Sequence, residues 1–383
     1  MNITRRTFGL GGLSLVITGC ASGGLVDAYS YANAPLSDDL RPAPNAGYDR
    51  WVASFRSRAQ AQGISAATLD AGFGNAGFLP GVVTRDRNQT EFTRTLEDYL
   101  AIAASEERVA NGRAALQTHR STLQQVEATY GVDAEIVVAI WGLESSYGER
   151  RGNIPVISST STLAFDGRRG RFFERQLIAA LRIIQNGDIA ARYLTGSWAG
   201  AMGHTQFIPT SYEAYAVDFT GDGRRDIWSD DPSDALASAA AYLQRNGWTS
   251  GTRWGAEVTG SSGGGTIIQP QAGGPRFAVT DNFNVIKRYN NSDSYAIGVG
   301  HLADRIAGGG PLQTPFPPDA NGLTQADREE IQRRLTALGF DTDGVDGVIG
   351  TNSRAAISDY QRSRNLPVTG EPSQALLRSL QGS

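Results

Sequence analysis

The chain has 383 residues, of which 40% are hydrophobic and 19% are charged, so its composition is that of a globular protein rather than a disordered one. The formal net charge of −4 argues against a nucleic-acid-binding protein, which would need an excess of basic residues. A single cysteine and three histidines without HExxH spacing exclude the usual zinc hydrolases. At roughly 150 residues per domain, the length predicts two to three domains.

The N-terminus has the features of an export signal. Arg5 and Arg6 precede an apolar stretch over residues 8–17, which is too short to span a membrane. The arginine pair resembles a twin-arginine signal, and Ile17-Thr18-Gly19-Cys20 resembles a lipobox. We therefore expect a signal peptide over residues 1–19 and a lipid anchor at Cys20 that holds the protein at the outer membrane in the periplasm. An ordinary signal peptide with an incidental cysteine is the alternative.

Composition divides the remaining chain into four parts. Residues 20–47 are rich in Ala, Gly, Ser and Pro and predict a tether, and the Gly- and Pro-rich residues 308–322 predict a linker. These two segments leave a large domain over residues 48–307 and a small domain over residues 323–383. No repeat or exposed heptad indicates an oligomer, so we expect a monomer.

The large domain is predicted to be mostly helical, because apolar residues recur at helical spacing in several segments. These segments are residues 116–130, 134–143, 172–185 and 234–246. Short β-type runs at 266–268 and 277–279 predict small strands or loop within residues 257–280. The expected fold class is mainly α, with an α+β catalytic domain.

Residues 133–148 contain the strongest candidate for a catalytic group. Asp133 is a candidate N-cap, and the apolar residues that follow form one stripe, made by Ile136, Ile140 and Leu143. Glu144 continues that stripe at the C-terminal end of the predicted helix. Burial and the negative end of the helix dipole both disfavour a carboxylate, so we expect a raised pKa for Glu144. A carboxylic acid that stays protonated is what a general acid for glycosidic cleavage needs. The alternative is a glutamate that caps a loop or pairs with Arg150.

Several motifs follow one another across the large domain. They are Gly-Leu-Glu-Ser-Ser-Tyr-Gly at 142–148, Thr-Leu-Ala-Phe-Asp-Gly-Arg-Arg at 162–169, Ser-Trp-Ala-Gly-Ala-Met-Gly-His-Thr-Gln-Phe-Ile-Pro at 197–209, Asp-Ile-Trp at 226–228, Gly-Trp at 247–248 and Arg-Tyr-Asn-Asn-Ser-Asp-Ser-Tyr-Ala at 288–296. In this order they resemble the membrane-bound lytic murein transglycosylase B family, over about residues 48–307.

The resemblance implies a lysozyme-like fold and cleavage of the β-1,4 bond between N-acetylmuramic acid and N-acetylglucosamine without water. Glu144 would protonate the glycosidic oxygen and then act as base toward the muramoyl 6-hydroxyl, giving a 1,6-anhydromuramoyl end. A hydrolase would need a second carboxylate, for which Asp166 and Glu149 are candidates, although we interpret Asp166 as structural. A hydrolytic muramidase and a non-catalytic peptidoglycan-binding scaffold remain the alternatives.

The same resemblance implies a set of substrate-binding positions. These are Ser145, Arg168, Arg169, Ser197, Gln206, Tyr289, Asn290 and Tyr295. The polar side chains would bind the sugars, and the tyrosine rings would line the groove. The two arginines could meet carboxylates of muramic acid or its peptide. A core or surface role is the alternative for each, and His204 receives no role.

Residues 218–226 resemble the start of an EF-hand loop, with oxygen-bearing side chains at alternating positions and glycine at position six. The candidate ligand set is Asp218, Thr220, Asp222, Arg224 and Asp234. Position twelve is Ser229 rather than the bidentate glutamate, so a later aspartate would have to complete the site. A structural calcium ion is therefore a candidate, while catalysis is expected to require no cofactor. A metal-free Asx-turn loop is the alternative.

The small domain is predicted to contain three short helices. Ile331, Leu335 and Leu338 recur at helical spacing before Gly339, and a motif over residues 346–361 precedes a last helix at 373–380. The domain resembles the peptidoglycan-binding domain of many cell-wall hydrolases, which would raise the local concentration of glycan strands at the catalytic groove. A passive helical cap is the alternative. The expected partners are thus peptidoglycan and, through Cys20, a membrane, with no nucleic acid.

Overall fold

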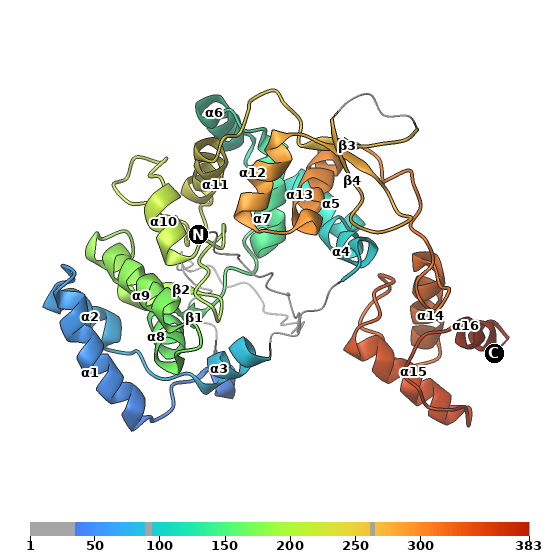
Figure 1. The fold of residues 1–383 in the computed structure, drawn as a ribbon, viewed down its shortest axis with the longest axis horizontal. Coiled ribbons are helices and arrows are strands. Elements are labelled where there is room, and N and C mark those ends of the chain that lie inside the picture. The colour runs from blue at the N-terminus through green and yellow to red at the C-terminus, as the bar shows by residue number, and fades with distance from the viewer. Residues whose placement is uncertain (1–34, 89–93, 261–264, 383) are drawn as a thin grey trace, which may run out of the picture. The chain divides into compact units, whose positions relative to one another are not determined.

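A computed structural model describes residues 35–88, 94–260 and 265–382 of the protein (Figure 1). The predicted signal peptide, Cys20 and the start of the predicted tether lie outside these residues. Among the residues described, no helix is both long and apolar enough to cross a membrane. The structure confirms a mainly helical protein with small β elements and a helical C-terminal region.

The described residues form two compact units, one containing residues 35–88 and 111–251 and the other residues 94–110, 252–260 and 265–382. The helices that lie in the first unit are α1 (Ala46–Gln60), α2 (Ala66–Phe73), α3 (Pro80–Arg87), α6 (Arg120–Tyr130), α7 (Ala134–Ser145), α8 (Val156–Asp166), α9 (Gly170–Gln185), α10 (Pro209–Tyr215) and α11 (Ser233–Arg245). Those of the second unit are α4 (Leu96–Ala103), α12 (Asp281–Tyr289), α13 (Asp293–Ile306), α14 (Gln325–Ala337), α15 (Thr351–Ser363) and α16 (Gln374–Gln381). Helix α5 (Glu106–Thr118) begins in the second unit and continues into the first.

Helix α8 is the polar centre of the first unit, where it packs along α9. Five consecutive hydroxyl residues of α8, over residues 158–162, are fully buried. Thr162 Oγ1 accepts the Leu79 N–H at 3.0 Å, and the Ser161 hydroxyl meets the Tyr48 hydroxyl at 2.7 Å. Through these bonds α8 holds α1 and the start of α3, because buried polar groups need partners inside the protein.

Folded structure begins before residue 48, inside the predicted tether. Leu40 is buried, Ala43 pairs with Phe78 in an isolated β-bridge, and the Asn45 side chain caps α1 by accepting from the Gly47 and Tyr48 N–H groups. Residues 36–47 therefore contribute to the first unit.

Helix α7 is almost entirely buried, which agrees with its apolar sequence. It begins after Asp133 as predicted, although the Asp133 side chain makes no capping hydrogen bond. The helix predicted over residues 116–130 is in fact two helices, because the backbone breaks at His119 between α5 and α6. Helical spacing of apolar residues continues across that break, so the periodicity alone did not reveal it.

Two short strands position the long motif that follows α9. β1 (Ile154–Pro155) pairs antiparallel with β2 (Thr195–Gly196), and bridges from Gly196 to Met202 and from Met202 to Phe207 continue the pairing. Residues 196–207 are therefore folded back on themselves as a compact segment rather than an open loop.

The second unit contains a small sheet of order β3-β5-β4. The strands predicted at 266–268 and 277–279 are present as β4 (Thr266–Ile268) and β5 (Phe277–Val279), and both β3 (Gly255–Glu257) and β4 run antiparallel to β5. The strand β3 was not predicted, since its Gly-Ala-Glu sequence has no β-type pattern.

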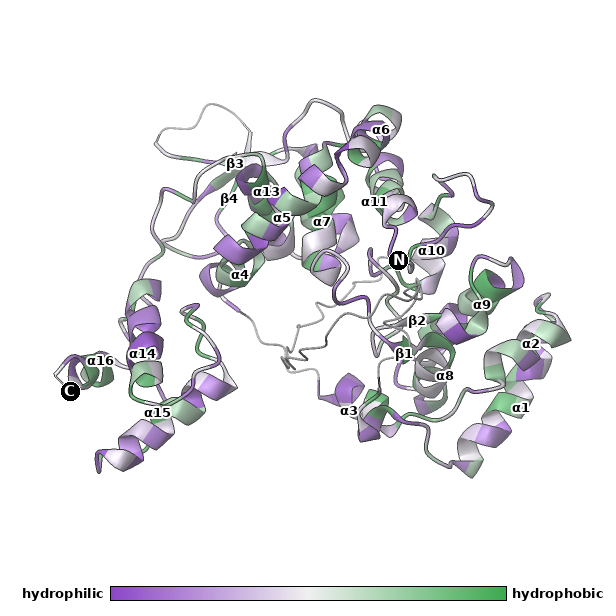
Figure 2. Cartoon of the chain, turned by 180° about the vertical axis from the view of Figure 1, so that it is seen from behind, coloured by the Kyte–Doolittle hydropathy of each residue, from purple (hydrophilic) through white to green (hydrophobic). Residues whose placement is uncertain are grey.

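The C-terminal helices α14, α15 and α16 enclose their own apolar core. In α15, hydrophilic and hydrophobic residues alternate along the ribbon (Figure 2), and Ile357 and Tyr360 face the core. Leu338, which continues the helical spacing of Ile331 and Leu335 in the sequence, is 42% exposed and lies outside this core. It follows the last residue of α14 and is succeeded by Gly339 at φ 90°, so the chain has already left the helix.

Arg328 of α14 ties the C-terminal helices to α4 within the second unit. Its guanidinium lies 2.7 Å from Glu97 and 3.2 Å from Asp98, and Arg328 and Glu97 are both buried. Asp319, in the predicted linker, adds a third carboxylate at 3.3 Å. Removing one partner of such a pair would leave an uncompensated buried charge, so this contact specifies how α14 docks on α4.

The polar interior of the first unit gives a test of stability. In Thr162→Val the Leu79 N–H would lose its acceptor in the core, and we expect the free energy of unfolding to fall by about 1–3 kcal/mol. Thr160→Val is the matched control, because that equally buried hydroxyl donates to the Val156 carbonyl of its own helix. Urea unfolding followed by circular dichroism measures both. Equal losses in the two variants would contradict the role given to Thr162.

Candidate active site

The chain makes an abrupt turn where α7 ends at the predicted catalytic residue. Glu144 is half-buried, and Ser145 is the last residue of the helix. Ser146, Tyr147 and Gly148 then follow one another with φ of 50°, 58° and 92°. A run of left-handed residues that includes two non-glycine residues is costly, and such backbone conformations concentrate at functional sites.

Ser145 holds this turn from inside. Its hydroxyl donates to the His204 carbonyl at 2.8 Å and accepts the Gly148 N–H at 3.2 Å, and its carbonyl accepts the Arg150 N–H at 2.8 Å. Ser145 is also buried. The predicted substrate-binding hydroxyl is thus engaged within the protein, where it shapes the turn beside Glu144.

The segment with Ser197 and Gln206 lies against the chain that leaves α7. The Gln206 side chain donates from Nε2 to the Arg151 carbonyl at 3.1 Å and to the Gly203 carbonyl at 2.9 Å. Ser197 Oγ accepts the Ala201 N–H at 3.1 Å. Gln206 and Ser197 are both half-buried. The structure therefore brings Gln206 against Arg151, three residues beyond the α7 turn, while Ser197 shapes the start of the same segment.

Arg168 and Arg169 are occupied by a carboxylate of the protein itself. Arg168 donates to both Asp86 oxygens at 2.5 Å, and Arg169 donates to Asp86 Oδ1 at 2.7 Å. Burial alone would raise the pKa of Asp86, but the hydrogen bonds and charges of Arg168 and Arg169 outweigh it and lower that pKa. These contacts favour a structural role for the two arginines.

Three predicted residues belong to the other unit. Tyr289 and Tyr295 are 2% and 3% exposed, and their rings stack with centroids 6.4 Å apart. Asn290 follows α12, and its Oδ1 is a buried atom with no hydrogen-bond partner among the residues that the structure describes. An unsatisfied acceptor of this kind is suited to receive a hydroxyl group from a ligand.

Three carboxylates of the predicted calcium loop converge. Ligand atoms of Asp218, Asp222 and Asp234 lie within 4.8 Å of one another. Asp234 accepts the Phe219 and Thr220 N–H groups at 2.9 Å, which closes the loop onto α11. The Arg224 side chain pairs with Asp222 at 3.0 Å, so the positive charge of its guanidinium disfavours the binding of a cation there. The convergent oxygens fit a hard cation such as Ca²⁺.

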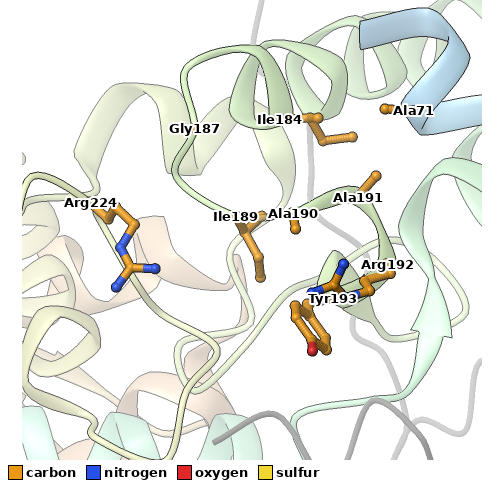
Figure 3. A pocket seen from close by; sticks show the side chains of 9 residues that line it. All are labelled: Ala71, Ile184, Gly187, Ile189, Ala190, Ala191, Arg192, Tyr193 and Arg224. Atoms are coloured by element: carbon orange, nitrogen blue, oxygen red, sulfur yellow. The ribbon is translucent and has the colours of Figure 1, made fainter. Parts of the chain in front are cut away.

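The structure also contains a cavity of about 540 Å³ in the first unit. Figure 3 shows its lining side chains, which come from α2, the end of α9 and the segment after it, together with Arg224. Apart from Arg224 of the calcium loop, it contains none of the predicted site residues. The candidate active site is accordingly defined by the α7 turn and not by this cavity.

Sequence reasoning missed two polar residues that support the predicted ones. Asp86 stands in α3 outside every motif, so nothing in its spacing indicated that it binds the arginines. Arg151 directly follows the α7 turn and donates to the Trp228 and Ser229 carbonyls at 3.0 and 2.8 Å, and it pairs with Asp230 at 2.7 Å. The position of Arg151 just after the glutamate motif was the one available signal.

Comparison with known proteins gives two family matches. A model described as "Transglycosylase SLT domain" matches residues 47–269 and 261–304, and one described as "Putative peptidoglycan binding domain" matches residues 324–380. Over 232 residues the chain is 33% identical to membrane-bound lytic murein transglycosylase B of Escherichia coli (strain K12). That alignment covers 52% of this chain, and it spans 64% of the length of the relative.

Solved structures of lytic transglycosylases are also similar to this chain. The crystal structure of SltB3 from Pseudomonas aeruginosa in complex with NAG-NAM-pentapeptide is 43% identical, with a TM-score of 0.69, and the match covers 88% of this chain and 100% of that one. The structure of the Escherichia coli lytic transglycosylase Slt35 in complex with calcium is 27% identical, with a TM-score of 0.58. That match covers 69% of this chain and 94% of the Slt35 chain. These matches agree with the resemblance that the ordered motifs indicated.

The Asp86 cluster predicts a pH-dependent contribution to stability. A carboxyl whose pKa is lowered by folding stabilises the folded state above its unfolded pKa, and this contribution is lost as the pH falls through the folded pKa. We expect Asp86→Asn to reduce the free energy of unfolding by about 2 kcal/mol at pH 7, with a gap to wild type that closes in acid.

Urea unfolding between pH 7 and pH 3 measures this difference. Asp38→Asn is the control, since Asp38 and Arg41 form an ion pair whose side chains are 92% and 61% exposed, and such surface pairs contribute less than about 1 kcal/mol. A gap for Asp86→Asn that stayed constant with pH would contradict the prediction.

Proposed function

Because the chain belongs to the transglycosylase SLT domain family, we propose that it is a lytic transglycosylase of peptidoglycan that uses Glu144 as its single catalytic carboxylate. It would cleave the β-1,4 bond between N-acetylmuramic acid and N-acetylglucosamine and leave a 1,6-anhydromuramoyl end. The hydrolytic muramidase and the non-catalytic scaffold are its rivals. The complex of SltB3 with NAG-NAM-pentapeptide supports the substrate class, since that protein is 43% identical over most of this chain.

The observation that carries the proposal is the position of Glu144 at the end of α7. The helix behind it is buried, the turn ahead of it is left-handed, and the side chain itself is half-buried. A rigid helix end fixes a carboxyl group in direction, and partial burial leaves one side open to a ligand. This combination suits a group that must first give a proton and then take one.

The reaction would proceed in two steps at this carboxyl. Glu144 gives its proton to the glycosidic oxygen, the bond from C1 of the muramoyl residue to that oxygen breaks, and the N-acetylglucosamine side leaves as an alcohol. Glu144, now ionised, takes the proton from the muramoyl 6-hydroxyl, whose oxygen forms a bond to C1. The carboxyl returns to its starting state, so the cycle consumes neither water nor a cofactor.

Two observations favour this route over hydrolysis, which needs a second carboxylate. Asp166 is engaged with Arg87 at 2.5 Å at the end of α8, as expected of a structural residue. Glu149 is exposed and lies beyond the turn that follows Glu144. Neither residue has the setting of a nucleophile or a water-activating base.

The remaining site residues are proposed in supporting roles. Gln206 would bind a sugar beside the α7 turn, and Asn290 would use its buried Oδ1 to accept a sugar hydroxyl. For Ser145, Ser197, Arg168, Arg169, Tyr289 and Tyr295 the internal contacts favour positioning of the site over direct binding of substrate.

The segments outside the catalytic region would bring the enzyme to its polymer. We propose that residues 323–383 bind peptidoglycan, which the matched domain description supports. Export to the periplasm and lipid attachment through Cys20 at the outer membrane are proposed from the sequence of residues 1–20. The similarity to a membrane-bound lytic murein transglycosylase is consistent with them.

The proposed chemistry is tested by the products that the enzyme releases from purified sacculi. We expect residues 21–383 to release anhydromuramoyl muropeptides, detected by mass spectrometry. The Glu144→Gln variant should release roughly a thousandfold less, because the glutamine amide can neither donate a proton to the glycosidic oxygen nor accept one from the 6-hydroxyl. Glu149→Gln is the matched control and should act like wild type.

The rivals predict other products. Reducing ends would support a hydrolase, with Asp166→Asn as the next variant to examine. No products from wild type or from Glu144→Gln, with both proteins retained on sacculi, would support the scaffold.

We further propose that the loop at residues 218–226 holds a structural calcium ion, which the calcium complex of Slt35 supports. Calcium should then raise the melting temperature by a few degrees relative to EDTA, by mass action on the folded state. Asp222→Asn should abolish that shift, whereas Asp231→Asn, outside the convergent set, should retain it. A melting temperature that does not respond to calcium would favour the metal-free loop.

A further inference from the structure

We propose that His204 is a positioning residue for Glu144, which it serves by clamping the C-terminal end of α7 from both sides of the glutamate. The inference rests on the proposed function, because it assigns His204 a part in the geometry of that one carboxyl. The motifs assigned His204 no role, because its contacts form only in the folded protein.

The imidazole of His204 bridges two elements through both of its nitrogens. Trp141 of α7 donates from Nε1 to His204 Nδ1 at 3.0 Å, and His204 Nε2 lies 2.7 Å from the Ser229 carbonyl. An indole nitrogen can only donate and a carbonyl can only accept. The hydrogen-bond network therefore assigns the neutral tautomer with its proton on Nε2.

The backbone of His204 makes a second set of contacts. Its carbonyl accepts the Ser145 hydroxyl at 2.8 Å, and its N–H donates to the Ile227 carbonyl at 2.9 Å. Trp141 lies three residues before Glu144, and Ser145 lies one residue after it. One residue thus holds the helix on either side of the catalytic carboxyl.

The turn after Glu144 is built to admit the His204 ring. A Cβ atom at Gly148 would come within 2.5 Å of His204 Cε1, and the φ of 92° at Gly148 also favours glycine. The imidazole consequently packs where any larger residue at position 148 would displace it. His204 is 3% exposed, so it is buried by the protein's own residues.

The surroundings keep this imidazole neutral. Burial lowers the pKa of His204 to about 4, and Arg151 lowers it further, while the Ser229 carbonyl, Asp226 and Asp230 oppose the shift. On the α6 side, His119 packs edge-on against Trp141 with ring centroids 5.4 Å apart, and burial lowers its pKa as well. The bond from Trp141 to His204 therefore persists through the neutral pH range, and protonation of Nδ1 in acid would break it.

Loss of the clamp should affect catalysis more than binding. A displacement of about 1 Å in a reacting group can reduce the rate roughly a hundredfold. We expect His204→Leu to lower kcat on a soluble NAG-NAM oligomer about tenfold or more, with KM within about twofold of wild type. His204→Asn places an oxygen near the position of Nδ1 and should recover most of that loss.

Trp141→Phe tests the same bond from its other end. It should lower kcat to a similar extent as His204→Leu. The double variant should have about the same kcat as either single variant, because both substitutions remove the same hydrogen bond. His301→Leu is the control for burial alone. His301 is 7% exposed and lies in the other unit, so its loss should lower the melting temperature without lowering kcat.

The outcomes separate this inference from the proposed function. If folded His204→Leu, checked by circular dichroism, has the kcat of wild type or raises only KM, the clamp is overturned. If His204→Leu does not fold, wild-type kcat in Trp141→Phe overturns it instead. Activity retained in Glu144→Gln would remove the proposed function itself, whatever the His204 variants do.

Discussion

The turn that ends α7 is the constraint on which the rest of the site depends. Burial of the helix on all sides fixes its direction, but a buried helix end leaves carbonyl groups without partners and cannot simply fray into water. The chain resolves this within a few residues by adopting left-handed conformations at Ser146, Tyr147 and Gly148. Glu144 directly precedes that turn, which the hydroxyl and carbonyl groups of Ser145 hold by hydrogen bonds.

The segments that close over the turn come from distant parts of the first unit. Residues 196–207 fold back through β2 and two bridges, which carries His204 to Trp141 and Gln206 to Arg151. Arg151 in turn reaches the Trp228 and Ser229 carbonyls. Three of the motifs that the sequence shows in order, at residues 142–148, 197–209 and 226–228, are thus adjacent in space and joined by hydrogen bonds.

Polar groups also organise the remainder of the protein. The hydroxyl groups of α8 hold the N-terminal helices, Asp86 gathers two arginines, and Arg328 joins α14 to α4. A buried polar group is costly unless its partner is in place, so these contacts discriminate strongly among alternative packings. Apolar burial alone would stabilise many arrangements of these helices, whereas the polar contacts favour one.

The sequence by itself determined the helical class, the position of α7, the β-type runs that form β4 and β5, and the ordered motifs that lead to Glu144, because these depend on periodicity and local residue type. Only the tertiary structure decided the break at His119, the pairing of β3, the partnership of Asp86 with the two arginines, and the contacts of His204. The pairing of β3, the contacts of Asp86 and the contacts of His204 each join residues far apart in the chain, which no local sequence pattern indicates. The same distinction holds at the candidate site: the sequence motifs indicated Glu144 as the candidate carboxyl, and packing decided the contacts of the turn beside it.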